Sequence, residues 1–365
     1  MARLIGTAAM RLTLFGTGEL ARVVANSLAL LHSGPLHVTI AGRDLGKAAD
    51  LGRVAQTLAR SRHPGSVFEA VELECFEESG PVAELLVRLA PDVVVCCASL
   101  SSSREAETTP SAWTELIGGA GFGIALPLHT VIPLTLAQAL RQIGSKAVLL
   151  NSCYPDAVNP LLAAQGLPIF GGLGNAATIA AAVQAELRVA DRERLHVLAH
   201  HRHLYGPAGG EVAIWLDGHR IEDAGRVLAP LRAARRSSRY PLIGMAAAHL
   251  VNAVGGDVPE LLHLPGPLGH PGGYPVVVQG RSVAISLPGG VSMAEARTVN
   301  ARAAEADGVS VSAEGWATPS PEASRQLAAC LPELAAGFAA GDVRSAAKEL
   351  LDLRARLRRC EPLGE

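Results

Sequence analysis

The segment RLTLFGTGELA, residues 11–21, is the most informative stretch of this sequence. Residues 11–15 form a short apolar run typical of a strand, and residues 22–31 carry apolar side chains at helical spacing. Between them stands a G-x-G-x-x-A turn, in which the first glycine makes a tight turn and the second admits a pyrophosphate. The following helix N-terminus offers backbone N–H groups to phosphates. We therefore predict a nucleotide site formed by Gly16, Thr17, Gly18, Glu19 and Leu20.

The strand–helix alternation continues outward from this turn to residue 152. Asp92 to Ala98 (DVVVCCA) is an unalternating apolar run, typical of a strand covered on both faces of a parallel sheet. The pattern predicts an α/β fold whose residues 1–152 form a Rossmann-type, doubly wound parallel sheet. The other expected strands are His37–Ala41, Val67–Leu73 and Ala147–Leu150, and the helices are Leu45–Arg60, Val82–Leu89 and Val131–Gln142.

The remainder of the chain predicts an α+β domain over residues 153–315 and a helical C-terminal extension over residues 316–365. Its expected helices are Ala176–Val189, Leu242–Val254 and Ser292–Asp307, and its strands are Leu195–Ala199, Glu211–Leu216, Tyr274–Gln279 and Ser282–Ser286. Within the first domain, Ser99 to Gly123 is rich in Ser, Thr, Glu, Gly and Pro and is too long for an ordinary connection. We expect this stretch to be a mobile or disordered loop, with residues 118–123 as a lid.

Composition excludes several classes of protein. The 365 residues are 49% apolar and 18% charged, which excludes a disordered or collagen-like chain. A net charge of -2 without long runs of one sign argues against nucleic acid as a partner. No uninterrupted apolar stretch reaches about 18 residues and no signal peptide is recognisable, so a cytoplasmic protein without a membrane partner is expected. The six cysteines show no C-x-x-C spacing, and we expect reduced thiols and no metal site.

The end of the second strand bears on the choice of cofactor. An NAD site usually offers an acidic residue to the ribose hydroxyls, whereas this chain presents Gly42-Arg43, and an arginine suits the 2′-phosphate of NADP. NADP is therefore favoured over NAD. The alternative is that Arg43 is a solvated loop residue and Asp44 binds the ribose. Ala98 and Ser99, at the end of the fourth strand, are expected beside the cofactor.

The sequence His200-His201-Arg202-His203 follows a predicted strand and has three interpretations. One imidazole can serve as a general acid and base near neutral pH. A divalent metal is the second interpretation, with Cys153 or Asp156 as a third ligand. The third is a solvated strand end. The residues alone leave these alternatives open.

The order of these motifs resembles that of the lactate/malate dehydrogenase family and its relatives, the NAD- and metal-dependent glycosidases. The resemblance runs from about Arg11 to Val309. It rests on the glycine turn, on residues 47–51, 91–95 and 149–152, and then on residues 171–175, the histidine cluster, residues 275–280 and the helix 292–307. It implies a two-domain fold, a homodimer or tetramer, a His–Asp acid/base pair and arginines that bind a substrate carboxylate.

Carrying the family's functional residues over gives several matches and two departures. The resemblance implies His201 as the catalytic histidine, Asn151 beside the nicotinamide and Arg104 as a loop arginine. Asn175 stands where the family's aspartate is expected, and Thr178 stands at an arginine position. These losses predict a weaker base and a substrate other than malate or lactate, such as a larger ketone or a cyclic imine, with Tyr154 and Arg202 as further substrate contacts.

The expected function is therefore hydride transfer between a nicotinamide and a carbonyl or imine carbon, in a specialised biosynthetic pathway. One alternative is a glycosidase-like enzyme with Cys153 and His201 as metal ligands, against which we set the shorter length of this chain. The other is a nucleotide-binding protein that has lost its activity, because fold alone does not imply function.

Overall fold

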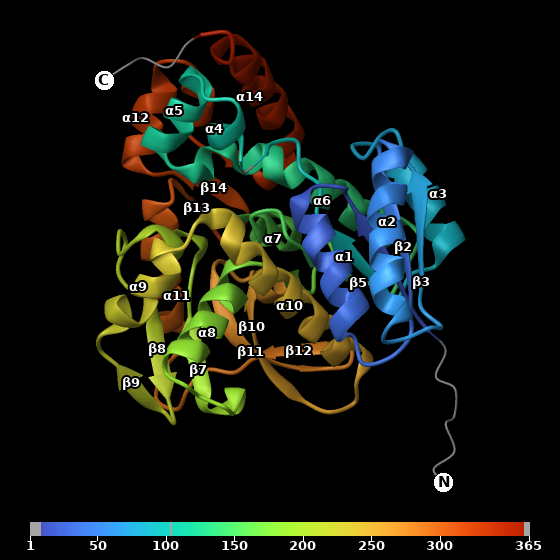
Figure 1. The fold of residues 1–365 in the computed structure, drawn as a ribbon. Coiled ribbons are helices and arrows are strands. Elements are labelled where there is room, and N and C mark those ends of the chain that lie inside the picture. The colour runs from blue at the N-terminus through green and yellow to red at the C-terminus, as the bar shows by residue number, and fades with distance from the viewer. Residues whose placement is uncertain (1–8, 103, 361–365) are drawn as a thin grey trace.

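The computed structural model describes residues 9–102 and 104–360 and has a six-stranded parallel sheet in its N-terminal half (Figure 1). The strand order is β3-β2-β1-β4-β5-β6, so the direction of winding reverses between β1 and β4. In doubly wound sheets ligands bind at the carboxyl ends of the strands beside this switch point. The strands are β1 (Met10–Phe15), β2 (Leu36–Gly42), β3 (Val67–Glu72), β4 (Val93–Cys96), β5 (Val148–Asn151) and β6 (Gly171–Gly172).

Helices cover both faces of this sheet, as its apolar strands require. All four residues of β4 are buried, and Phe15 at the end of β1 pairs with Cys96. The helices are α1 (Glu19–Leu31), α2 (Leu45–Arg60), α3 (Ser79–Leu89), α6 (Leu126–Gln142) and α7 (Pro155–Ala164). The predicted fold class is confirmed.

Helix α6 is a long helix that is buried along most of its length. Together with the preceding turn, residues 122–142 are long and apolar enough to cross a membrane by length and composition alone, but 94% of the apolar window is buried inside the protein. The segment is thus a core helix, packed against α3, α7 and the C-terminal helix α14 (Val343–Leu357).

The C-terminal half contains three small antiparallel sheets and the helices between them. The sheets are β7 (Leu195–Leu198), β8 (Ala213–Leu216) and β9 (His219–Ile221); β10 (Glu260–Pro265), β11 (Gly273–Gln279) and β12 (Ser282–Ile285); and β13 (Val309–Val311), β14 (Trp316–Pro319) and β15 (Phe338–Ala339). The helices are α8 (Asn175–Glu186), α9 (Ala224–Ala233), α10 (Arg236–Gly255), α11 (Met293–Ala306), α12 (Pro321–Ala328) and α13 (Pro332–Ala335), with short 3₁₀ turns η2 (Arg192–Arg194), η3 (His201–Tyr205), η4 (Pro267–Gly269) and η5 (Ala340–Asp342).

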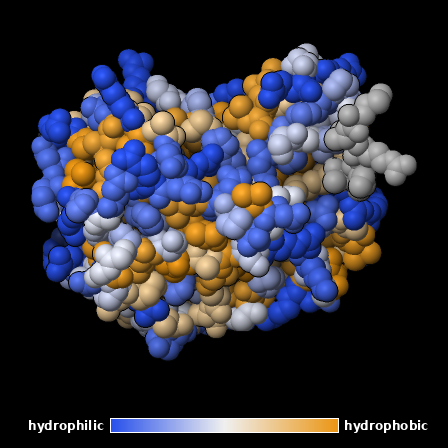
Figure 2. All heavy atoms as spheres, turned by 90° about the horizontal axis from the view of Figure 1, so that it is seen from below, coloured by the Kyte–Doolittle hydropathy of each residue, from blue (hydrophilic) through white to orange (hydrophobic). Residues whose placement is uncertain are grey.

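Helix α10 joins the two halves by lying against α1. Gly244 allows this close approach, because a Cβ atom there would lie 2.6 Å from the carbonyl oxygen of Val23. On the face seen from below, hydrophobic residues are interspersed among hydrophilic ones (Figure 2). The oligomeric state stays a prediction.

Contacts cross both of the predicted boundaries between the parts of the chain. The parallel sheet continues past residue 152, because β6 pairs with β5. Two glycines carry no side-chain pattern, so the sequence gives no sign of this strand. Residues beyond 316 do not stand apart either: Leu350 and Leu353 of α14 are buried in the same core as Leu128 and Leu136 of α6.

The stretch 99–123 is not the long loop that its composition predicts. It contains α4 (Glu105–Thr108), α5 (Ala112–Ala120) and the 3₁₀ turn η1 (Phe122–Ala125), and it lies against α12 and α14 (Figure 1). Gly121 and Gly123 are packed tightly, since a Cβ atom on either would lie 2.6 Å from a backbone atom of residues 307–309. Two glycines of the predicted lid, Gly121 and Gly123, therefore pack against the C-terminal half.

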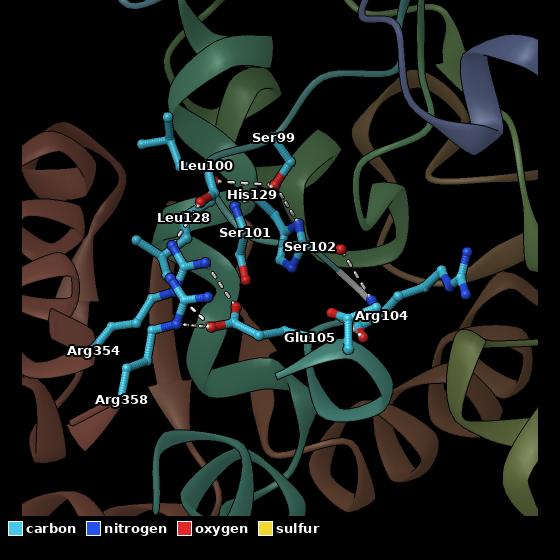
Figure 3. A network of polar contacts seen from close by, with 11 residues as sticks. Ser99, Leu100, Ser101, Ser102, Arg104, Glu105, Leu128, His129, Arg354 and Arg358 are labelled. Carbon is cyan, nitrogen blue, oxygen red and sulfur yellow. Dashed lines mark hydrogen bonds and ion pairs between the residues drawn. The ribbon is translucent and has the colours of Figure 1, made fainter. Parts of the chain in front are cut away.

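A buried ion cluster ties this stretch to α14. The carboxylate of Glu105, which is 5% exposed, pairs with Arg354 at 2.8 Å and with Arg358 at 3.0 Å. Arg354 also donates to the carbonyl oxygen of Leu100 at 3.0 Å (Figure 3). A buried carboxylate needs such partners, because an unpaired charge is costly away from water.

Candidate active site

A cavity of about 800 Å³ opens at the carboxyl ends of the parallel strands. Its size is within the range of cofactor and substrate sites. Twelve of the predicted site residues line it: Gly16, Thr17, Gly18, Glu19, Leu20, Arg43, Ala98, Ser99, Arg104, Tyr154, Asn175 and His201. The sequence had dispersed these residues over nearly 190 positions, and the sheet topology brings them together.

The glycine turn has the geometry that phosphate binding requires. Gly16 has a φ of +116°, and a Cβ atom there would lie 2.9 Å from the backbone of Cys97. Gly18 faces open space, with nothing within 4 Å of a Cβ position, and no side chain caps the N-terminus of α1. The first N–H groups of that helix are thus available to an anion.

Glu19 begins α1 and pairs with Arg22, whose Nε donates to the carboxylate at 3.0 Å. The hydrogen bond from Arg22 lowers the pKa of Glu19, so the carboxylate is ionised at neutral pH. Its charge is thereby offset beside the glycine turn.

The two residues considered for the ribose end of the cofactor are placed differently. Asp44 is the N-cap of α2: its Oδ1 accepts the N–H of Lys47 at 3.0 Å, and Lys47 Nζ lies 3.5 Å from Oδ2. Arg43 is exposed and lines the cavity together with Lys47. One end of the cavity wall therefore offers two cations, and the nearby carboxylate already has partners.

His201 lines the cavity, and the partner of its side chain is Asp307, a residue to which the sequence does not point. His201 Nδ1 lies 2.9 Å from Oδ2 of Asp307, and both side chains are more than 90% buried. The Tyr154 hydroxyl donates to the same oxygen at 2.8 Å. Oδ1 of Asp156 accepts the backbone N–H of His201 at 3.3 Å. These contacts fix the ring and leave Nε2 as the nitrogen available to a ligand.

The charges of this group follow from its contacts. Burial alone would raise the pKa of Asp307, but the charge and hydrogen bond of His201, with help from His200 and Tyr154, lower it to about 2. Burial and the charge of Asp307 raise the pKa of Tyr154 well above its usual value, so the phenol stays protonated and donates. Asp307 is therefore an ionised hydrogen-bond acceptor for the Nδ1–H of His201.

The position of the acidic partner is corrected here. Asn175 lines the cavity, but the residue that contacts the His201 imidazole is Asp307, so a carboxylate is present beside the histidine although Asn175 carries no charge. Asp307 lies 106 positions from His201, at the C-cap of α11. The sequence near Asp307 contains one indication of its role. The helix dipole disfavours a carboxylate at the C-terminus of a helix, so an aspartate at the C-cap of α11 indicates a role other than helix stability.

Asn151 is also placed differently from the expectation. It is fully buried and is not among the residues that line the cavity. Its amide donates to Asn159 at 2.9 Å and to the carbonyl oxygen of Cys153 at 3.1 Å, and its oxygen accepts the N–H of Cys153. Asn151 therefore shapes the turn after β5, and its hydrogen bonds are used within the protein.

In the histidine cluster, His201 lines the cavity, whereas His200 and His203 form hydrogen bonds within the protein. His200 Nδ1 accepts the N–H of Arg202, and His203 Nδ1 accepts the N–H of His200, which together cap η3. Burial lowers the pKa of both rings, that of His203 to about 3, so they stay neutral. Of the three imidazoles, only that of His201 lines the cavity.

Cys153 does not join His201 as a metal ligand. Its thiol donates to the carbonyl oxygen of Ala98 at 3.0 Å, and the hydrogen bond with Cys96, together with burial, raises its pKa well above the usual value. Within residues 9–102 and 104–360, no three His, Cys, Asp or Glu side chains form a cluster suited to a metal ion. The ligand set of the glycosidase hypothesis is therefore not assembled in the part of the chain that the structure describes.

The two predicted substrate arginines face different spaces. Arg104 lines the first cavity and its Nε donates to Glu107 at 3.1 Å. Arg202 lines a second cavity, of about 980 Å³, which shares the ring of His201 with the first. This second space also contains Arg236, Arg302 and Arg325.

Solved structures share this two-part architecture. The minor L-lactate dehydrogenase of Enterococcus mundtii is 15% identical with a TM-score of 0.51, and the match covers 82% of this chain and 96% of that one. The lactate dehydrogenase of Eimeria maxima, solved with NADH and oxamate, is 15% identical, with a TM-score of 0.51 and coverages of 82% and 92%. The fold is lactate dehydrogenase-like. Neither a protein-family model nor a curated protein matches the sequence.

A glycosidase has the same fold over a longer stretch. The 6-phospho-β-glucosidase of Thermotoga maritima is 13% identical with a TM-score of 0.54, and the match covers 97% of this chain and all of that one. The resemblance to both groups is thus confirmed at the level of the fold. The length of this chain is therefore no argument against a likeness to this glycosidase, since the match spans all of it.

Proposed function

We propose that this chain is an NADP(H)-dependent oxidoreductase that transfers a hydride between the nicotinamide and a carbonyl or imine carbon. The observation that carries the proposal is that one cavity is lined both by a phosphate-binding glycine turn and by the buried His201–Asp307 pair. An anion site and a proton donor in one cavity are what a nicotinamide-dependent dehydrogenase needs. That one of the similar structures contains NADH supports the same assignment.

The residues present fit the cofactor. Gly16 and Gly18 leave room for a pyrophosphate, the N-terminus of α1 supplies its hydrogen bonds, and Arg43 with Lys47 favours a 2′-phosphate. When bound, the cofactor supplies the hydride donor or acceptor at the nicotinamide ring.

The residues of the chain then provide the proton chemistry. In the direction of reduction, protonated His201 donates its Nε2 proton to the carbonyl oxygen or imine nitrogen of the substrate. In the direction of oxidation, neutral His201 accepts that proton while Nδ1–H stays bonded to Asp307. Tyr154 holds the carboxylate in place through its hydroxyl. The restored carboxylate also argues against a nucleotide-binding protein that has lost its activity.

The test is a titration of the purified protein with NADPH and with NADH, followed by nicotinamide fluorescence. We expect tighter binding of NADPH, because Arg43 and Lys47 attract the additional phosphate. In Arg43→Asp, NADPH binding should weaken about tenfold or more, while NADH binding changes less. Arg60→Asp, on the last turn of α2, is the control for a change of surface charge.

Two results would contradict the proposal. If neither nucleotide binds, the chain is not a nicotinamide-dependent enzyme. If Arg43→Asp leaves the affinity for NADPH unchanged, Arg43 does not contact the 2′-phosphate and the preference for NADP is wrong. Once binding is established, ketones and cyclic imines are the substrates to screen first.

A further inference from the structure

His129 on α6 lines the same cavity but has no part in the proton chemistry above. Its side chain is buried, with the residue 4% exposed, and its Nδ1 lies 2.8 Å from the hydroxyl of Ser99 (Figure 3). Its Nε2 is buried and has no hydrogen-bond partner among the described residues. Buried polar atoms are rarely left unpaired, because the lost hydration is costly. Because His129 lines the cavity, its unpaired nitrogen indicates a ligand.

The contacts of Ser99 determine which ring nitrogen of His129 carries the proton. The Ser99 hydroxyl oxygen already accepts the N–H of Ser101 at 3.1 Å. Its own proton can go to His129 Nδ1 at 2.8 Å or to the carbonyl oxygen of Leu128 at 3.4 Å, and that carbonyl already accepts the N–H of Leu100. The contact with His129 Nδ1 is the better hydrogen bond, because it is shorter and because Nδ1, unlike the Leu128 carbonyl oxygen, has no other donor. His129 therefore accepts at Nδ1 and carries its proton on Nε2, which makes Nε2–H a donor without an acceptor.

The surroundings of the ring select the kind of acceptor. Burial, followed by the charges of His201, Arg236 and Arg354, lowers the pKa of His129 to about 3, so the ring stays neutral. Arg236 and Arg239 line the same cavity, and their guanidinium groups attract an anionic oxygen. Phe122 lies between the two cavity histidines, with ring centroids 4.9 Å from each. His129 and His201 can therefore contact different parts of one ligand.

We propose that Nε2–H of His129 binds the substrate of the reaction at His201 by donating a hydrogen bond to an anionic carboxylate or phosphate oxygen on it. The assignment to substrate rests on the proposed function, in which the glycine turn and Arg43 bind the phosphates of the cofactor. Good substrates should therefore carry an acidic group that lies apart from the reacting carbon and binds to His129.

The first test uses the unmodified protein with labelled histidine. Long-range ¹H–¹⁵N spectra distinguish the two neutral tautomers, and we expect the Nε2–H form at His129 at pH 7. Acetate and inorganic phosphate serve as probes, each added with and without NADPH. A saturable shift of the His129 Nε2 signal with acetate alone assigns a carboxylate, and with phosphate alone a phosphate. No shift with either anion overturns the proposal, and so does a shift of equal size on adding NADPH alone, which would assign the donor to the cofactor.

Variants give an independent reading. His129→Gln keeps a donor in a similar place and should retain anion binding within about threefold, whereas His129→Phe should weaken it about tenfold or more. Binding is followed by the rise in the thermal-unfolding midpoint with anion concentration. His37→Gln, at a half-buried β2 histidine that pairs with Glu69 outside the cavity, is the matched control. Equal anion affinity in His129→Phe and the wild type would contradict the proposal.

The same samples separate this inference from the proposed function. A protein that binds NADPH but shows no response of His129 to either anion keeps the proposed function and loses this subsite. A protein that responds to the anions but binds neither nucleotide keeps the anion site at His129 and loses the oxidoreductase assignment.

Discussion

The proposed chemistry depends on His201, and the neighbouring His200 and His203 are the controls for its replacement. Replacing it with alanine should lower turnover about 100-fold or more, because a positioned acid and base contributes at least that much. His200 and His203 cap η3 and do not line the cavity, so their replacement should act mainly on stability. The measurement is the rate of NADPH oxidation with the best substrate from the screen. Full activity in His201→Ala would show that another residue is the proton donor.

Asp307 predicts a dependence of stability on pH. Its pKa is about 2 in the folded protein, below the value of about 3.9 expected in the unfolded chain. A lowered pKa means that the carboxylate contributes stability above the unfolded value, and that this contribution is lost as the pH falls from about 4 to about 2. The contribution is on the order of 2 kcal/mol.

The variant Asp307→Asn tests this expectation without a substrate. It should unfold more easily at pH 7 and lose less stability than the wild type between about pH 4 and pH 2. Chemical denaturation at several pH values measures both effects, and Asp223→Asn, at an exposed N-cap, serves as the control. Parallel stability curves for Asp307→Asn and the wild type would show that the carboxylate is not held by the contacts described.

At the scale of the element, η1 holds Asp307 in place. The N–H of Gly123 donates to the carbonyl oxygen of Asp307 at 2.7 Å, and a Cβ atom on Gly123 would lie 2.6 Å from the backbone nitrogen of Val309. Gly123→Ala should therefore destabilise the protein by about 1–3 kcal/mol through overpacking. Gly118→Ala is the matched control: it lies in α5 with open space around it, and alanine there should stabilise by about 0.5–1 kcal/mol. Thermal unfolding compares the two, and equal midpoints would show that η1 can move away from Asp307.

The elements that the sequence predicts well are those with strong local signals. The expected helix Leu45–Arg60 has the same bounds as α2, which Asp44 caps, and the helix expected from Ser292 begins with a capping box between Ser292 and Glu295. The elements that it misses lack such signals. β6 consists of two glycines, and α7 begins after Tyr154, a non-glycine residue in the left-handed region with a φ of +45°.

The candidate site divides in the same way. The glycine turn and His201 could be predicted because each is a local motif or lies within a short cluster. The Asp307 contact could not, because it joins residues 106 positions apart and depends on how α11 lies against η3. The unpaired nitrogen of His129 is likewise visible only once α6 is packed beside the end of β4.

At the scale of the whole molecule, the C-terminal region is part of the first core. α14 buries Val343, Ala346, Ala347, Leu350 and Leu353, chiefly against α6, and Arg354 ties it to Glu105. Burying one leucine stabilises a protein by roughly 1.5–3 kcal/mol, while whole proteins are stable by only about 5–15 kcal/mol. Removing the helix would also expose the apolar face of α6 to water.

A variant that ends at Asp342 should therefore lose cooperative unfolding and expose hydrophobic surface, whereas one that ends at Cys360 keeps every contact of α14 described here. Circular dichroism during heating, together with binding of a hydrophobic dye, measures both properties. NADPH binding is a second measurement, because Ser99 and Leu100 line the cavity and Arg354 donates a hydrogen bond to the carbonyl oxygen of Leu100. If the shorter variant unfolds cooperatively near the wild-type temperature and binds NADPH equally well, α14 is not needed for the stability of the first core.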